Sequence, residues 1–163
     1  MIRIIIILVL MCINASSAAD HPIFNSIKKL SPDINDKQAK KYATIIEKYS
    51  KEYQVDWHIV LAIFRQESNF QLDAVNYASG DYGIGQIHHT NIKAKKLSLV
   101  KLLTDPEYAI NQTFVMLSEL KKSYEKKEKN TWFTRYHSFK AENRKEYHGI
   151  LKKWLKEMGK PAK

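Results

Sequence analysis

Glu67 is the residue of this chain whose type and setting most strongly suggest chemistry. It lies near the end of a largely apolar segment, residues 57–68, and a glycine-rich turn, residues 80–87, follows shortly after it. Removing a carboxylate from water disfavours its charged form and raises its pKa toward the range in which it can transfer a proton. We therefore interpret Glu67 as a candidate general acid.

Three short motifs in the chain resemble those of the lytic transglycosylases, lysozyme-like enzymes of the bacterial cell wall with an SLT-type domain. They are residues 65–70 (Arg-Gln-Glu-Ser-Asn-Phe), residues 83–87 (Gly-Ile-Gly-Gln-Ile) and residues 135–138 (Arg-Tyr-His-Ser). Each motif is weak alone, but all three occur in the family's order at domain-sized separations. The resemblance runs from about residue 53 to residue 154. Within the family, the chain looks most like the small single-domain members that accompany envelope-spanning secretion and conjugation machines.

This resemblance implies cleavage of the β-1,4 bond between N-acetylmuramic acid and N-acetylglucosamine in peptidoglycan. Ordinary glycosidases use two carboxylates for such a cleavage. Enzymes of this family use one glutamate, which protonates the leaving sugar and then, as a carboxylate, takes a proton from the substrate's own C6 hydroxyl. That hydroxyl closes a 1,6-anhydro ring, and no water is consumed. Glu67 would be both the acid and the base, and no cofactor would be required.

The neighbouring motif residues would bind the sugar or orient the acid. Ser68 could orient the substrate or the carboxylate, although capping of the helix end would also explain it. Gln86 follows two glycines that allow a close backbone approach or a positive φ, and its amide could bind a sugar hydroxyl or acetamido group. Tyr136 matches the third-motif tyrosine, whose hydroxyl lies close to the catalytic glutamate in the family, with a core tyrosine as the alternative.

Three positions depart from the family pattern. His137 stands where asparagine is usual, and a histidine could still donate a hydrogen bond while adding pH dependence near neutrality. Ala109 stands where the family often has asparagine, with Asn111 two residues further on, so we assign no site role to that helix. Gly85 stands where methionine is common, which predicts a slightly wider floor of the cleft.

Aromatic and acidic residues between the first two motifs are further candidates. Tyr77, Tyr82 and Phe70 could stack on sugar faces, with core packing as the alternative. Asp73 and Asp81 are the only carboxylates close to the motifs in sequence. If either faced the candidate acid across the cleft, it could activate water and make a hydrolytic muramidase possible.

We predict no metal site. The pair His88-His89 invites a metal interpretation, but adjacent histidines point in different directions. They also lack the i, i+4 or Cys/His spacing that zinc sites use.

Hydrophobic periodicity predicts a mainly α fold, and the resemblance implies the goose-type lysozyme architecture with a small loop or hairpin region after the catalytic helix. Residues 69–87 should form that loop region, and residues 21–29 a short helix or an irregular arm. The last helix should span about residues 142–158. The helix starts should be capped by Asp36, Asp56, Ser98, Asp105-Pro106 and Thr131.

The helix after Pro106 and the last helix should each bury one apolar stripe in the core. The three tryptophans, Trp57, Trp132 and Trp154, should also be core residues. The helix after Pro106 should run to near residue 130. The inward residues of the last helix should be Tyr147, Ile150, Leu151, Trp154 and Leu155.

Residues 1–19 have the pattern of a secretory signal peptide, with Arg3, an apolar run and small residues before a cut after Ala19. The apolar run is roughly ten residues, whereas a membrane span needs about 20. An uncleaved anchor, or a lipoprotein joined through Cys12, is the alternative. Cleavage would leave one domain, residues 20–163 with a core of about 36–158, in the periplasm or secreted. We assign no function to residues 20–35.

The chain is strongly basic, with 27 Lys and Arg against 17 Asp and Glu and a formal charge of +10. Such an exported protein favours anionic surfaces, including wall polymers. Because the lysines follow helix faces and no nucleic-acid motif accompanies them, we do not expect nucleic-acid binding. The expected partners are peptidoglycan strands and an envelope-spanning secretion or conjugation machine. Three hypotheses result: a lytic transglycosylase, a hydrolytic muramidase on the same fold, or a wall-binding assembly factor.

Overall fold

The computed structural model describes residues 21–160, so the predicted signal peptide and its cleavage site lie outside the described residues. The described part is mainly α, as predicted. Its elements, in chain order, are α1 (Pro22–Leu30), α2 (Asp36–Tyr53), α3 (Trp57–Ser68), β1 (Val75–Asn76), β2 (Asp81–Tyr82), β3 (Ile87–His88), α4 (His89–Ala94), α5 (Leu99–Thr104), α6 (Pro106–Tyr124), the 3-10 helix η2 (Trp132–Tyr136) and α7 (Ala141–Glu157).

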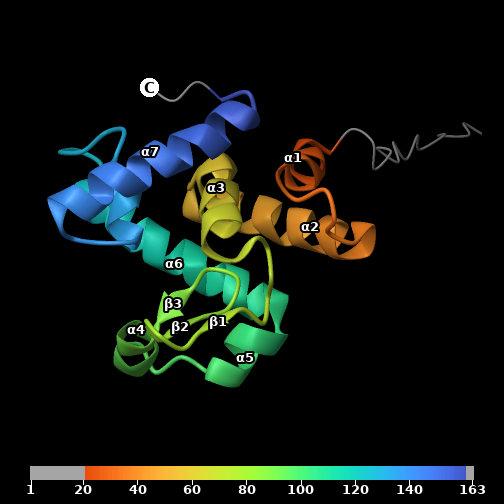
Figure 1. Ribbon diagram of the computed structural model, residues 1–163, viewed down its shortest axis with the longest axis horizontal. Coiled ribbons are helices and arrows are strands. Elements are labelled where there is room, and N and C mark those ends of the chain that lie inside the picture. The colour runs from red at the N-terminus through yellow and green to blue at the C-terminus, as the bar shows by residue number, and fades with distance from the viewer. Residues whose placement is uncertain (1–20, 161–163) are drawn as a thin grey trace, which may run out of the picture.

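The helix α3 lies at the centre of the molecule, with the other long helices around it (Figure 1). It packs against α7 on one side and against α1 and α2 on the other, while α2 also packs along α6. Residues 60–64 of α3 are fully buried in the core. The apolar run that suggested a buried helix in the sequence is therefore the central element of the fold.

Both ends of α3 are capped, and the N-cap is the residue that the sequence predicted. Asp56 is the N-cap residue, and its carboxylate accepts a hydrogen bond from the backbone N–H of His58 at 3.0 Å. At the other end Asn69 adopts a left-handed conformation with φ 50°, and its backbone N–H bonds to the carbonyl of Phe64. These caps fix the start and the stop of the helix that carries Glu67.

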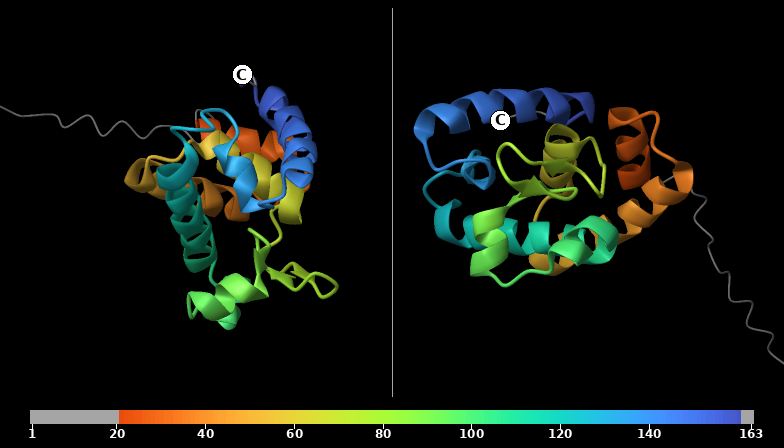
Figure 2. Two further views of the ribbon diagram at one scale, coloured as in Figure 1. Left: turned by 90° about the vertical axis from the view of Figure 1, so that its left-hand side faces the viewer. Right: turned by 60° about the horizontal axis from the view of Figure 1, so that its bottom comes forward.

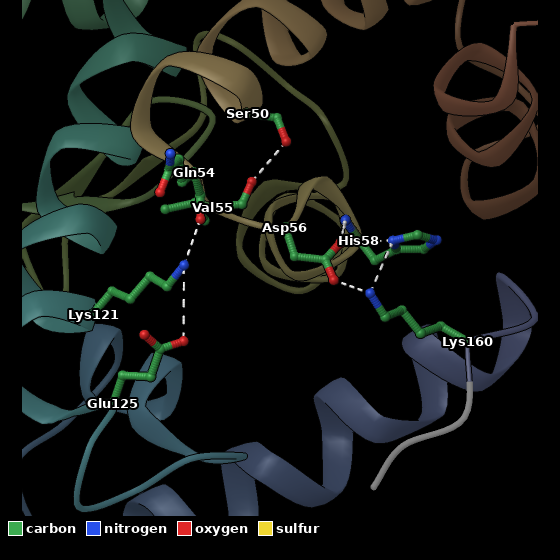
Figure 3. Close-up of polar contacts among 8 residues, drawn as sticks. All are labelled: Ser50, Gln54, Val55, Asp56, His58, Lys121, Glu125 and Lys160. Atoms are coloured by element: carbon green, nitrogen blue, oxygen red, sulfur yellow. Dashed lines mark hydrogen bonds and ion pairs between the residues drawn. The ribbon is translucent and has the colours of Figure 1, made fainter.

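The connection from α2 to α3 is held by side chains from three other places in the chain (Figure 3). Ser50 donates to a backbone carbonyl of the connection at 2.7 Å. Lys121 of α6 donates to the carbonyl of Gln54 at 2.5 Å. Lys160, which follows α7, pairs with the carboxylate of Asp56. The N-terminal end of α3 is therefore fastened to α2, to α6 and to the C-terminal segment.

Residues 69–87 form the structured region that was expected, and it contains a three-stranded antiparallel sheet in the order β1-β2-β3. With α4 and α5 this sheet forms a lobe beside the helical body (Figure 2). Gly83, with φ +77°, makes the turn after β2, and a Cβ there would lie 2.7 Å from the carbonyl oxygen of Leu102. Glycine is therefore required at this turn.

Helix boundaries differ from the sequence prediction at three places. Asn35, rather than Asp36, is the N-cap of α2, and its Oδ1 accepts two backbone N–H groups at 2.8 and 3.4 Å. The helix α6 ends at Tyr124 instead of near residue 130, because the Lys- and Glu-rich residues that follow carry no apolar stripe to bury. Thr131 makes no side-chain cap, and the segment after it is a 3-10 helix.

The segment 21–29 was predicted as a short helix or an irregular arm, and the structure has the helix α1 there, Pro22–Leu30. Its buried face consists of Ile23, Ile27 and Leu30, and it packs against α2. Lys28 donates to the carbonyl of Ile34 at 2.7 Å, which ties α1 to the start of α2. None of the helices in residues 21–160 has the length and hydropathy to cross a membrane.

Candidate active site

Glu67 lies in the last turn of α3, where the buried helix meets the glycine-rich turn. Burial raises the pKa of its carboxyl from 4.5 to about 7; a hydrogen bond from Tyr147 opposes this rise, and the charge of Asp81 adds to it. The predicted elevation of this pKa is therefore present. Near neutral pH a substantial fraction of the carboxyl is protonated, which a proton donor requires.

Tyr147 of α7 is the direct partner of Glu67, and its hydroxyl donates to Oε1 at 2.5 Å. The Tyr147 ring is 3% exposed, and burial raises the pKa of its phenol, so it stays a neutral donor. The sequence prediction placed Tyr147 only in the core. The signal that could have found it is the phenol itself, because a buried tyrosine hydroxyl needs a hydrogen-bond partner.

His137 lies against the ring that holds Glu67. Its imidazole stacks on Tyr147 with ring centroids 4.5 Å apart and an angle of 12° between the planes. It lines the space around Glu67 together with Tyr136. The structure thus places His137 at the site, as a packing partner of the tyrosine that contacts the acid.

Tyr136 lies close to Glu67 but directs its hydroxyl elsewhere. Burial is the main cause that raises its pKa, with the charge of Glu67 adding to it. Its hydroxyl donates to the carbonyl of Gly85 at 2.7 Å. A Cβ on Gly85 would lie 2.8 Å from that hydroxyl and would also meet Thr113. These two side chains fill the space beside the glycine, so the wider cleft floor predicted from Gly85 is not found.

Gln86 is held in place by the turn that carries it. Its backbone is left-handed with φ 46°, an uncommon conformation for a residue with a side chain. Its amide nitrogen donates to the carbonyls of Ala74 at 3.1 Å and Gly83 at 2.9 Å. Because both amide hydrogens are used within the protein, the amide oxygen is the atom that Gln86 can offer to a sugar.

Ser68 fastens the end of α3 to the glycine-rich turn. It is buried, and its hydroxyl lies 2.8 Å from the carbonyl of Ile84 and 3.3 Å from that of Phe64. The single hydroxyl hydrogen is therefore used by the backbone. Of the two roles considered for Ser68, this geometry favours the structural one.

Three adjoining hollows share Glu67 and Gln66, with volumes of about 700, 540 and 370 Å³. The largest runs toward the sheet lobe and η2. The second lies along the end of α3 toward Trp154, and the third lies along α7 beside Tyr147 and Glu146. We call their union the groove. Glu67 lies where its parts meet, which is the place for an acid that acts on a bond within a bound chain.

Asp81 and Asp73 have different positions. Asp81 of β2 lines the largest hollow together with Glu67, and its charge contributes to the raised pKa of that residue. Asp73 is not among the residues that line the groove; burial, with a smaller contribution from the Asp73 charge, raises the pKa of Tyr42 in α2. Only Asp81 therefore shares the site with the candidate acid.

The aromatic residues proposed for sugar stacking do not gather at the groove. Phe70 is 1% exposed and packs edge-on against Phe64 at 6.4 Å, so the stacking interpretation of Phe70 is wrong and it is a core residue. Tyr77 is 87% exposed near the turn between β1 and β2. Tyr82 follows Asp81 on a strand, where neighbouring side chains point to opposite faces. Neither tyrosine is among the residues that line the groove.

Trp154 lies at the groove rather than in the core, where the sequence prediction put it. Its indole N–H donates to Oε1 of Gln66 at 3.2 Å, and it lines the second hollow. The guanidinium of Arg65 lies 4.7 Å from the ring centroid. Of the other tryptophans, Trp132 is buried as predicted, whereas Trp57 is only partly buried.

The remaining polar candidates have structural partners. His88 caps α4, and its ring nitrogen lies 2.7 Å from the hydroxyl of Thr90. Asn111 accepts a hydrogen bond from the hydroxyl of Tyr53 at 2.9 Å, and Ala109 is buried. Within residues 21–160 no group of three or more His, Cys, Asp or Glu side chains is arranged to hold a metal ion.

Comparison with known proteins gives the family. Residues 44–158 match the transglycosylase SLT domain. The chain belongs to the transglycosylase SLT domain family. The three motifs read from the sequence therefore led to the right family, and the site that they mark lies inside the matched region.

Two relatives illustrate the similarity of this SLT domain protein to known enzymes. The membrane-bound lytic murein transglycosylase C of Edwardsiella ictaluri is 33% identical over 131 residues, which cover 76% of this chain and 36% of that protein. The protein of the same name from Pectobacterium atrosepticum is 32% identical over 112 residues, covering 64% of this chain and 31% of the relative. The chain thus spans about a third of these relatives. No solved structure shows a significant match.

Proposed function

We propose that this protein is a peptidoglycan lytic transglycosylase that cleaves the bond between N-acetylmuramic acid and N-acetylglucosamine. The observation that carries the proposal is the position and state of Glu67. It is a carboxyl with a pKa of about 7 at the meeting point of a groove, in a chain of the SLT domain family. The two relatives are named as lytic murein transglycosylases, which supports the same reaction.

In the first step protonated Glu67 gives its proton to the glycosidic oxygen. The bond between that oxygen and C1 of the muramic acid breaks, and positive charge develops on C1 and the ring oxygen. The resulting carboxylate of Glu67 keeps the hydrogen bond from Tyr147, which stabilises the negative charge as it forms. The nearby charge of Asp81 favours the cationic sugar.

In the second step the carboxylate of Glu67 accepts the proton of the C6 hydroxyl. The oxygen of that hydroxyl bonds to C1 and closes the 1,6-anhydro ring. Glu67 is protonated again, so the proton that left it in the first step is restored and no water is consumed. The amide nitrogen of Gln86 donates to two backbone carbonyls, so its amide oxygen would accept a hydrogen bond from the sugar and hold the strand during both steps.

Mass spectrometry of digested peptidoglycan tests the reaction. The expected soluble products carry 1,6-anhydromuramic acid ends and no reducing muramic acid. Products heavier by one water, with reducing ends, would show hydrolysis instead. A protein that releases no fragments under conditions where it binds sacculi would contradict both enzymatic assignments and favour the wall-binding factor.

Asp81 supports hydrolysis as a second candidate reaction. It lines the same hollow as Glu67 and its charge reaches that carboxyl. A second carboxylate at this place could activate a water molecule on the opposite face of the sugar. Asp81→Asn separates the two reactions, because it would abolish hydrolysis but only slow formation of the anhydro product.

We also propose that the protein is exported to the periplasm or secreted, and that it acts together with an envelope-spanning secretion or conjugation machine. The apolar N-terminal pattern of residues 1–19 and the formal charge of +10 support export toward an anionic polymer. Cell fractionation, with and without the first 19 residues, tests the location. Co-purification of the Glu67→Gln protein with envelope complexes tests the partner.

A further inference from the structure

The groove contains little positive charge for so basic a chain. The sequence has 27 Lys and Arg residues, yet no lysine within residues 21–160 lines any of the three hollows around Glu67. The two arginines that do are Arg135 in the largest hollow and Arg65 in the second. The lysine charge is thus kept off the groove, and each arginine in it calls for a structural explanation.

The position of Arg135 has a structural explanation, because this arginine is paired with an acidic partner. Its guanidinium donates to both carboxylate oxygens of Glu128, at 2.9 and 2.6 Å. Arg144 binds the same carboxylate at 2.9 and 3.0 Å. These contacts hold η2 to α7, and they occupy the Nε and Nη2 donors of Arg135, the edge of the guanidinium that would pair with a ligand carboxylate.

Arg65 is held in the groove without an acidic partner. Its guanidinium donates to the amide oxygen of Asn69 at 2.5 Å and lies over the indole of Trp154. Its Nε is buried and has no hydrogen-bond partner within the described residues. Within residues 21–160, Arg65 forms no ion pair with a carboxylate, whereas Arg135 and Arg144 both pair with Glu128. A neutral amide and an aromatic face therefore fix the guanidinium and leave its charge uncompensated.

The surroundings of Arg65 suit a carboxylate on a ligand. The planar guanidinium binds carboxylates through paired N–H donors, and it is already oriented by the stack on Trp154. Trp154 is itself anchored by its hydrogen bond to Gln66, the residue next to Glu67 in α3. A ligand carboxylate here would lie in the second hollow, which adjoins the scissile position.

We propose that Arg65 binds a carboxylate carried by the muramic acid side chain of the substrate. The inference rests on the proposed function, because it assumes that a glycan strand occupies the groove. In peptidoglycan the lactyl group of muramic acid either bears a peptide stem with its own carboxylates or ends in a free carboxylate after the stem is removed. Both sources offer the same chemistry to the guanidinium, and neutral sugar hydroxyls do not.

Binding measured in the Glu67→Gln background tests this without relying on turnover. Three soluble glycan fragments of equal length serve as ligands in isothermal titration: one with peptide stems, one with stems removed and lactyl carboxylates free, and one with those lactyl carboxylates capped as methyl amides. Adding Arg65→Gln should weaken binding about tenfold for at least one of the two charged ligands. The charged ligand that responds identifies the source. Binding of the capped ligand should change by less than about twofold.

Two controls separate a binding role from a structural one. Lys153→Gln removes the other cation over the Trp154 ring, at an exposed position outside the groove, and should leave all three affinities unchanged. Arg65→Lys keeps the charge and should recover part of the affinity for the responsive ligand. Thermal unfolding then verifies that each variant remains folded.

The outcomes distinguish this inference from the proposed function. Equal weakening for all three ligands, or no weakening for any, would overturn the role of Arg65. If the protein with Glu67 intact releases no products from sacculi while its Arg65-dependent binding persists, the proposed catalysis fails and the carboxylate site stands.

Discussion

Glu67 and Glu128 are the same residue type held in opposite ways. Glu67 ends a buried helix, its partner is the neutral phenol of Tyr147, and its pKa is raised to about 7. Glu128 lies in the turn before η2, where Arg135 and Arg144 lower the pKa of its carboxyl to about 2. The surroundings, rather than the residue type, keep one carboxyl partly protonated near neutral pH, as a proton donor requires, and the other a permanent anion.

Glu128 also helps to position the side chains that surround Glu67. Glu128 joins η2 and α7 through its two arginines. These two elements, with the residue after η2, carry Tyr136, His137 and Tyr147, the side chains that surround Glu67. The permanent anion therefore helps to position the groups that set the state of the titrating one, and the four predictions below test this division.

The largest expected difference is in turnover. Glu67→Gln removes the only proton donor in the proposed reaction and should lower kcat by about a thousandfold or more. Glu128→Gln disturbs only the contacts that join η2 to α7 and should lower kcat by less than about tenfold. Release of soluble muropeptides from sacculi measures both. Comparable losses in the two variants would break the distinction between donor and support.

Stability should respond to pH in opposite directions at the two sites. The folded-state pKa of Glu67 lies above its unfolded value, so its contribution to stability is fully present below pH 4.5 and is lost as pH rises toward 7. Glu67→Gln, which cannot ionise, should therefore be more stable than the wild type at pH 8 by up to about 3 kcal/mol, with the difference vanishing near pH 4. Urea unfolding at both pH values measures this difference, and a variant no more stable at pH 8 would contradict a buried carboxylate whose partner is a neutral phenol rather than a cation.

Glu128 should show the reverse dependence. Its folded-state pKa lies below its unfolded value, so its contribution is present above pH 4.5 and is lost as pH falls toward 2. Glu128→Gln should cost about 1–2 kcal/mol at neutral pH, less than the full pKa shift implies because solvent screens a carboxylate that is still 21% exposed. The same urea series, extended to low pH, should show this cost shrinking. A cost that is constant with pH would mean that Glu128 acts through packing rather than charge.

The smallest effects concern the alkaline limb of the pH profile, which follows loss of the Glu67 proton near pH 7. Tyr147→Phe removes the hydrogen bond that favours the carboxylate. The pH at which activity falls should therefore rise by about one unit or less. Asp81→Asn removes a negative charge that repels the carboxylate, so the pH at which activity falls should decrease by a smaller amount. Profiles of kcat/KM measure both shifts, and shifts in the same direction would contradict the assigned contacts.

Much of the fold could be predicted because its signals are local. The apolar run before Glu67, the cap at Asp56 and the pair Asp105-Pro106 each act within a few residues of the chain. The same locality explains why burial of Glu67 could be predicted from its own helix. The family match now covers the three motifs, while the roles of individual site residues remain predictions.

The missed features depend on how distant helices pack. Tyr147 meets Glu67 across 80 positions of sequence, and although its buried phenol indicates that a hydrogen-bond partner exists, nothing within α7 says which residue that partner is. Trp154 was assigned to the core from its stripe, yet it lies at the rim of the groove, because the end of α3 meets it there. Phe70 follows a motif but is turned inward onto Phe64. Periodicity identifies the face of a helix, whereas the partner of that face is set by tertiary packing.

The fastening of α3 at both ends has a consequence for how a substrate is received. One end is held by Lys121 and Lys160, the other by Ser68, and residues 60–64 between them are fully buried. Fluctuations that release such a helix approach the free energy of unfolding the whole domain. Glu67 is therefore in place before any strand arrives, and the conformational entropy of ordering the acid is lost during folding rather than at each encounter. In the proposed reaction, only the glycan strand would have to be ordered when it binds in the groove.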